Sequence, residues 1–239
     1  MDNERLLERK SLEVDIRPQP NDETCGPTSL HAVYQYYNDL ISLENVIDQV
    51  KSLKSGGTLG VMLGNHALKR GYSAKLITYD LQMFDPTWFV GDISLEEKLK
   101  EQLEFKSGKK FKAATNAYLK FLHVGGEISF EELNSRLIRH LLAEGTPILT
   151  GLSATYLYNC SREIPETNEY HDLKGKPAGH FVVIRGFDPE RRLVYIADPL
   201  ESNPISETQY YLVGIRRLIN AILLGIVTYD ANLLVIKPK

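Results

Sequence analysis

The sequence lacks the features that point to membranes or nucleic acids. Its longest apolar run, residues 221–227, is far too short to span a bilayer. Residues 1–10 are charged and have no apolar core of the kind that a signal peptide needs. Lysine and arginine total 28 against 31 aspartate and glutamate residues, so no excess of positive charge indicates nucleic-acid binding. We therefore expect neither a membrane nor a nucleic-acid partner, and a cytoplasmic location.

Cysteine is also scarce, with only Cys25 and Cys160 in 239 residues. A single pair is not a disulfide framework, which agrees with a reducing compartment. The histidines on the expected helices lack the spacing of metal ligands. We expect no metal site and no cofactor. The hydrophobic fraction of 43% is ordinary for a globular protein, and a core of this size needs no covalent staples.

The order of helical and strand patterns indicates an α+β fold in a single domain over residues 1–239. The part at about 20–145 is helix-rich, and the part at about 146–239 is β-rich. Helices are expected near 26–38, 43–53, 59–69, 94–105 and 111–123, then from a capping box at Ser129 and Glu132 to about 143, and at 211–224. Strands are expected near 72–79, 147–152, 181–185, 193–197 and 233–236. A long polar loop covers 159–176 and could form a wall or lid.

Cys25 stands where the first of these helices should begin. Apolar residues follow at helical spacing from Leu30, and Pro27 suits a first helical turn. Unpaired N–H groups and the helix dipole at this end favour a thiolate, which is the nucleophilic form of cysteine. The alternative is that Cys25 is a small buried apolar side chain, as most free cysteines are. This segment by itself leaves both interpretations open.

His180 and Asp198 are brought together by an expected hairpin centred on Pro189. In this register Val182 faces Ile196, and His180 faces Asp198 on the same side of the sheet. Directly opposed Cβ atoms lie about 4.5–5.5 Å apart, which suits a carboxylate that accepts a hydrogen bond from an imidazole. A slip by one residue would put the pair on opposite faces. Alternatively, His180 is an ordinary histidine at a strand end.

Cysteine catalysis needs a base, a group that orients the base, and a donor for the developing oxyanion. Gln19 is a candidate for that donor, because it lies six residues before Cys25 between Pro18 and Pro20. On composition alone, a solvated surface amide is the better interpretation of Gln19.

The residue order Gln19, Cys25, His180, Asp198 matches that of papain-like cysteine hydrolases. The strings Cys25-Gly26-Pro27, 179–183 and 197–199, with 84–88 and 151–158, resemble the bacteriocin-processing (double-glycine leader) cysteine peptidases and their soluble relatives. The resemblance runs from about residue 15 to the end. The chain differs from transporter-linked members, because it has no transmembrane or nucleotide-binding region.

The resemblance implies a papain-like fold, in which the helix of Cys25 packs on an antiparallel sheet that carries His180 and Asp198. It also implies that Cys25 is the nucleophile, His180 the base, Asp198 the residue that orients it, and Gln19 the oxyanion donor. The expected activity is hydrolysis of a peptide or related amide through a thioester. Two alternatives stay open: an acyltransferase or transpeptidase with the same triad, and a papain-like binding module without activity.

Overall fold

The computed structural model describes residues 10–53 and 56–239. Residues 1–9 and 54–55 of the single domain expected over 1–239 lie outside the described residues. The helices are α2 (Cys25–Tyr36), α3 (Leu43–Gln49), α4 (Gly60–Lys69), α5 (Leu95–Phe105), α6 (Lys109–His123), α7 (Ser135–Ala143), α8 (Ala154–Tyr158) and α9 (Ile215–Leu224), with short 3₁₀ turns η1 (Pro86–Phe89) and η2 (Gly225–Thr228).

The strands are β1 (Lys10–Ser11), β2 (Tyr72–Thr78), β3 (Glu127–Ser129), β4 (Ile148–Ser153), β5 (Gly179–Asp188), β6 (Leu193–Ala197), β7 (Tyr210–Gly214) and β8 (Asn232–Pro238). They form one sheet in the order β3-β2-β8-β4-β5-β6-β7, and β1 pairs with β5. Neighbouring strands are antiparallel except for β2 and β3, which are parallel. The α+β fold class is confirmed.

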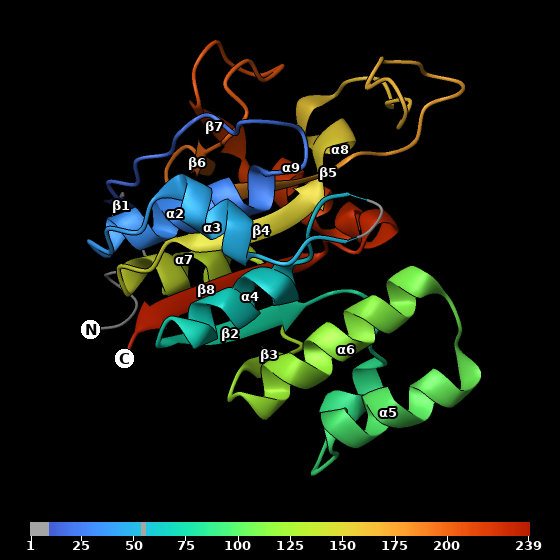
Figure 1. Cartoon of the computed structure of the whole chain (residues 1–239). Coiled ribbons are helices and arrows are strands. Elements are labelled where there is room, and N and C mark those ends of the chain that lie inside the picture. The colour runs from blue at the N-terminus through green and yellow to red at the C-terminus, as the bar shows by residue number, and fades with distance from the viewer. Residues whose placement is uncertain (1–9, 54–55) are drawn as a thin grey trace.

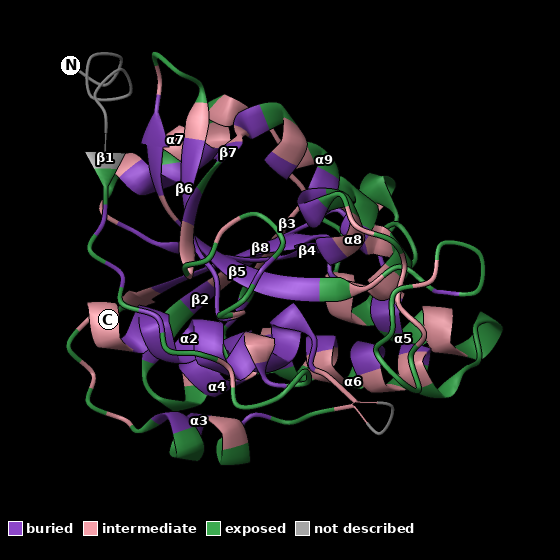
Figure 2. Ribbon diagram, turned by 90° about the horizontal axis from the view of Figure 1, so that it is seen from above, coloured by how far each residue is buried: buried purple, intermediate pink, exposed green. Residues whose placement is uncertain are grey.

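Helices cover both faces of the sheet (Figure 2). Helix α2 packs on β5 and β4, and α4 packs on β2 and β8, while α7 and α9 lie on the other side against β5 and β4. Helices α5 and α6 project from the β2 end of the sheet, and segment 159–178 projects near the start of β5 (Figure 1). The buried apolar side chains of these layers form one continuous core.

Local sequence signals set several helix ends as expected. Ser42 and Ser94 accept hydrogen bonds from Asn45 N–H and Glu97 N–H and so cap α3 and α5. Gly71, just beyond α4, has a φ of 91°, a left-handed conformation that suits glycine after a helix.

The capping box expected at Ser129 and Glu132 is wrong. Residues Glu127–Ser129 form β3, which pairs with β2, and the Ser129 hydroxyl donates to the Glu131 carboxylate instead. Helix α7 begins later, where Asn134 Oδ1 accepts from the N–H groups of Arg136 and Leu137. Pairing with a strand distant in sequence overrides the local helix signal here.

The single helix expected over 211–224 is also wrong, because the segment is divided between two elements. Its first part belongs to β7, which adds an outer strand to β6, and only Ile215–Leu224 is helical. The short helix α8, between β4 and the long polar loop, was not expected.

Candidate active site

Cys25 is the first residue of α2 and is half-buried. A tight turn before it fixes the start of the helix: the Thr24 hydroxyl and N–H both donate to Asn21 O, at 2.9 and 3.3 Å. The next residue, Gly26, is buried, and a Cβ there would lie 2.5 Å from Thr58 Cγ2. Glycine is therefore required at this position for the close packing of α2.

His180 is the second residue of β5 and is 7% exposed. Its Nε2 lies 2.8 Å from Asp198 Oδ1, and its ring also makes a side-chain hydrogen bond with Cys25. Since Nε2 is used by Asp198, Nδ1 is the nitrogen left for the sulfur. The structure thus brings Cys25, His180 and Asp198 together, with the imidazole between the thiol and the carboxylate.

The hairpin register that was expected to join His180 and Asp198 is wrong. The observed partners are Ile184 with Ile196 and Val183 with Ala197, and a bulge lies between Ile184 and Gly186. The pairing is displaced by two residues from the expected one. A shift by two keeps both side chains on the same face, because successive side chains alternate. The His180–Asp198 contact therefore survives, but from a diagonal position just beyond the end of β6.

Asp198 has no exposed surface, and four groups donate to its carboxylate. His180 Nε2 and Leu200 N–H reach Oδ1, at 2.8 and 2.9 Å. The hydroxyls of Tyr158 and Tyr211 each lie 2.7 Å from Oδ2. Neither tyrosine was identified from the sequence. Tyr158 ends a string that was noted only for its resemblance, and Tyr211 was assigned to a helix, so nothing indicated that either would face Asp198.

The pKa values of the pair shift in opposite directions. Burial by itself lowers the pKa of His180, but the charge and hydrogen bond of Asp198, with a smaller effect of Cys25, raise it to about 10. Burial by itself raises the pKa of Asp198, but His180⁺, the Tyr211 hydroxyl and Leu200 N–H hold it below its ordinary value. Both shifts favour an imidazolium beside a carboxylate.

Gln19 lies beside this group of residues, but neither of its hydrogen bonds reaches Cys25. Its N–H donates to Pro199 O at 2.9 Å, and its Nε2 donates to Asn21 O at 3.0 Å. The Oε1 atom is buried and has no hydrogen-bond partner within the described residues. Gln19 thus joins the turn that leads into Cys25 to the residue that follows Asp198.

A cavity of about 610 Å³ lies beside the chain segments that lead into Cys25 and His180. It is lined on one side by residues 21–23 and on the other by residues 177–179, and polar residues of the long loop, among them Glu163 and Asn168, complete the wall. Asn168 Nδ2 donates to Asp22 Oδ2 at 2.7 Å, which ties the loop to the turn before Cys25. Cys25 and His180 are not among the residues that line this cavity, but two of the lining segments lead directly into them.

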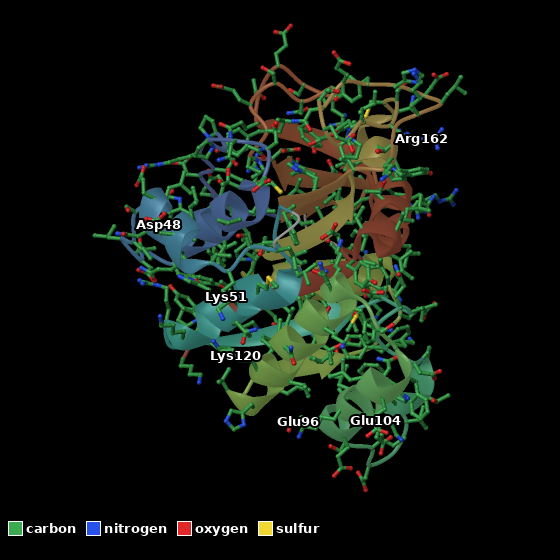
Figure 3. The ribbon with its side chains drawn as sticks, turned by 45° about the vertical axis from the view of Figure 1, so that its right-hand side comes forward. Asp48, Lys51, Glu96, Glu104, Lys120 and Arg162 are labelled. Atoms are coloured by element: carbon green, nitrogen blue, oxygen red, sulfur yellow. The ribbon has the colours of Figure 1, made fainter. Side chains whose placement is uncertain are left out.

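The long loop over 159–176 has internal order. Glu163 and Lys176 exchange two backbone hydrogen bonds, of 3.1 and 2.8 Å. Arg162 of this loop lies at one end of the molecule, and Glu96 and Glu104 of α5 lie at the other (Figure 3). Cys160, at the start of the loop, is a free thiol like Cys25. Burial and the charge of Glu163 raise the pKa of the Cys160 thiol.

Within the described ranges, no three His, Cys, Asp or Glu side chains are grouped so as to hold a metal ion. No helix among the same residues is both long and apolar enough to cross a membrane.

Comparison with protein families gives a match to the Peptidase_C39 like family over residues 11–214. Comparison with curated proteins gives no significant match. Among solved structures, a Bacillus anthracis protein described as a C39-like peptidase has a TM-score of 0.51 and 16% identity, covering 97% of this chain and 98% of its own. This likeness shows the fold.

Two further structures are similar at lower scores. A double-glycine-motif protease of an AMS/PCAT transporter, solved with its leader peptide, has a TM-score of 0.47 and 17% identity, covering 98% of this chain and 97% of its own. Xylellain, a cysteine protease of Xylella fastidiosa, has a TM-score of 0.46 and 17% identity, covering 99% and 89%.

Proposed function

Because the chain belongs to the Peptidase_C39 like family and is a papain-like cysteine peptidase, we propose that it cleaves a peptide or related amide bond through a thioester on Cys25. The observation that carries the proposal is the connected row of side chains. Cys25 is hydrogen-bonded to His180, and His180 is hydrogen-bonded to a fully buried Asp198.

In the first step Cys25 Sγ attacks the scissile carbonyl carbon, after its proton has passed to His180. The carbonyl oxygen becomes an oxyanion, and the tetrahedral intermediate collapses as the C–N bond breaks. His180⁺ gives its proton to the leaving amine. Water then attacks the thioester, with His180 as the base, and the thiol is restored. Asp198 holds the imidazole so that Nδ1 faces the sulfur throughout.

Gln19 is proposed as the oxyanion donor. The support is positional: its backbone is fixed beside Asp198 by the bond to Pro199, and its side chain lies against Asn21, four residues before Cys25. For the amide to reach an oxyanion at Cys25, Nε2 must exchange its bond with Asn21 O for the substrate oxygen. The buried, unpartnered Oε1 leaves the Gln19 amide poorly satisfied in its present orientation.

We also propose that the whole chain acts as one catalytic domain, since both halves contribute strands to one sheet and residues to one core. A cytoplasmic setting is proposed on the ground that both cysteines are free and that the nucleophile works only as a reduced thiol.

The test is cleavage of a peptide library by the wild-type protein, Cys25→Ala, Gln19→Ala and Cys160→Ala. We expect Cys25→Ala to be inactive with unchanged circular dichroism, and Cys160→Ala to keep full activity. Gln19→Ala should lose about 10²–10³ in rate, as loss of one oxyanion donor does elsewhere. Retained cleavage by Cys25→Ala would contradict the proposal. Products formed with and without added amine separate hydrolysis from acyl transfer.

A further inference from the structure

The two tyrosines that contact Asp198 come from outside the hairpin that carries His180. Tyr158 is the last residue of α8, and Tyr211 is the second residue of β7. Both are at least nine-tenths buried, and both hydroxyls reach the same atom, Oδ2, at 2.7 Å. Two elements that are independent of each other thus fix one oxygen of the carboxylate.

The four donors divide evenly between the two oxygens. Oδ1 takes His180 and Leu200 N–H, and Oδ2 takes the two phenols. A carboxylate without solvent contact is unfavourable unless its lone pairs are satisfied. Here each oxygen has two donors, so the charge is held without any need for water.

We propose that Tyr158 and Tyr211 are positioning residues of the peptidase, which fix the rotation of Asp198 and keep it ionised so that it can orient His180. This inference rests on the proposed function, since it concerns the base of that reaction. Tyr158 has a second contact with the site, because its ring lies 6.0 Å from the His180 ring, centroid to centroid, at an angle of 53°.

The proposal has a consequence for pH dependence that a merely structural role lacks. Donors to the charged form of a carboxyl lower its pKa, so loss of either phenol makes Asp198 easier to protonate. Protonated Asp198 no longer supports the imidazolium that faces the Cys25 sulfur. The acid-side loss of thiolate reactivity must then move to higher pH.

The test uses Tyr158→Phe, Tyr211→Phe and the control Tyr210→Phe. Tyr210 precedes Tyr211 on β7, and its hydroxyl instead bonds Ile16 N–H at 3.0 Å and Asp15 at 3.3 Å. The readout is the rate of Cys25 alkylation by iodoacetamide from pH 3 to 9, with Cys160 as the internal reference. Each of the first two variants should raise the acid-side midpoint by about one pH unit, roughly the effect of one hydrogen bond to a charged group. Tyr210→Phe should leave the midpoint unchanged.

An unchanged midpoint in both folded variants would overturn the inference while leaving the proposed function intact. If Cys25 of the wild-type protein reacts no faster than Cys160, the proposed function itself fails. A measurement without tyrosine variants covers the case in which they do not fold. Carboxyl ¹³C NMR of the wild-type protein, assigned with Asp198→Asn, should show the pKa of Asp198 below that of an ordinary aspartate carboxyl, and an ordinary or raised value contradicts the inference.

Discussion

Asp198 and Asp188 lie on the same hairpin, and each is followed by a proline, yet they have different surroundings. The Asp198 carboxylate meets His180 and the two phenols, whereas Asp188 Oδ1 accepts from Arg191 N–H at 2.9 Å and closes the turn. Composition does not separate the two. The distinction comes from the strand pairing, in which Asp188 is opposed by Leu193 at the far end of β5 from His180.

We therefore expect Asp198→Ala to lower turnover of a selected peptide by about 10²–10⁴, because the imidazole loses its orienting partner. Asp198→Asn should retain part of the activity, since an amide oxygen still accepts the imidazole N–H. Asp188→Ala should keep activity within about twofold and instead lower the free energy of unfolding by about 1 kcal/mol, because the Arg191 N–H in the turn loses its acceptor. Full activity in Asp198→Ala would remove Asp198 from the site.

Asp230 is a second buried carboxyl near the site, and its pKa is shifted in the opposite direction to that of Asp198. The Asp230 side chain is 6% exposed and lies against Gly179, the residue directly before His180. A Cβ on Gly179 would lie 2.1 Å from Asp230 Oδ2, so a side chain at position 179 would clash with the carboxyl. Burial raises its pKa to about 7. Thr228 and Lys110 partly offset this shift, and the charge of Asp80 adds to it. Asp80, at the end of β2 near Asp230, has its own pKa raised by burial to about 6.

The sign of the resulting pH dependence follows from the raised pKa. The folded protein holds the Asp230 proton more tightly than the unfolded chain, so this stability is full below about pH 4 and is lost as pH rises through about 7. Asp230→Asn cannot ionise. At pH 8 the free energy of unfolding of this variant should exceed that of the wild type by on the order of 1–3 kcal/mol, and its melting temperature should be higher. Both differences should vanish by pH 4.

Asp80→Asn is the matched variant for this measurement. It should show the same trend with its midpoint about one pH unit lower, in line with the smaller shift of Asp80. A difference between Asp230→Asn and the wild type that does not change with pH would show that the carboxyl is not held protonated.

At the scale of elements, the sequence predicts what depends on near neighbours. The starts of α3 and α5 follow from Ser42 and Ser94, and the start of α2 at Cys25 follows from Pro27 and the apolar spacing. The strands β3 and β7 and the short helix α8 were missed or misassigned, and so was the register of the hairpin. The two strands are decided by partner strands elsewhere in the chain. The register is decided first by the turn, which lies between Asp188 and Leu193 and is not centred on Pro189, and then by the bulge between Ile184 and Gly186.

The cap of α7 tests this account of element boundaries. Asn134→Ala should lower the free energy of unfolding by about 1 kcal/mol, because two N–H groups of the first turn lose their acceptor. Ser129→Ala serves as the control and should cost clearly less, since the Ser129 hydroxyl caps no helix and donates to the half-buried Glu131 carboxylate. Thermal melts of the two variants check the prediction, and the reverse order of stabilities would place the helix start at Ser129 after all.

At the scale of the whole molecule, the sheet assembles the site from residues far apart in sequence. Helix α2 brings Cys25 to the start of β5, and the end of β6 brings Asp198 to the same place. The sequence predicts which residues take part through their order and chemistry. It does not predict that Tyr158 and Tyr211 contact Asp198. Those contacts depend on how α8 and β7 pack beside Asp198, and no local sequence pattern determines that packing.

The central claim is that Cys25 is activated by His180. Its most direct test is the rate of iodoacetamide alkylation of the two cysteines of the native protein at pH 6–7, followed by mass spectrometry of their peptides. Cys25 should react at least about tenfold faster than Cys160, because it is paired with an imidazolium at a helix start, whereas the Cys160 thiol has a raised pKa. Equal rates, or faster reaction of Cys160, would contradict the account.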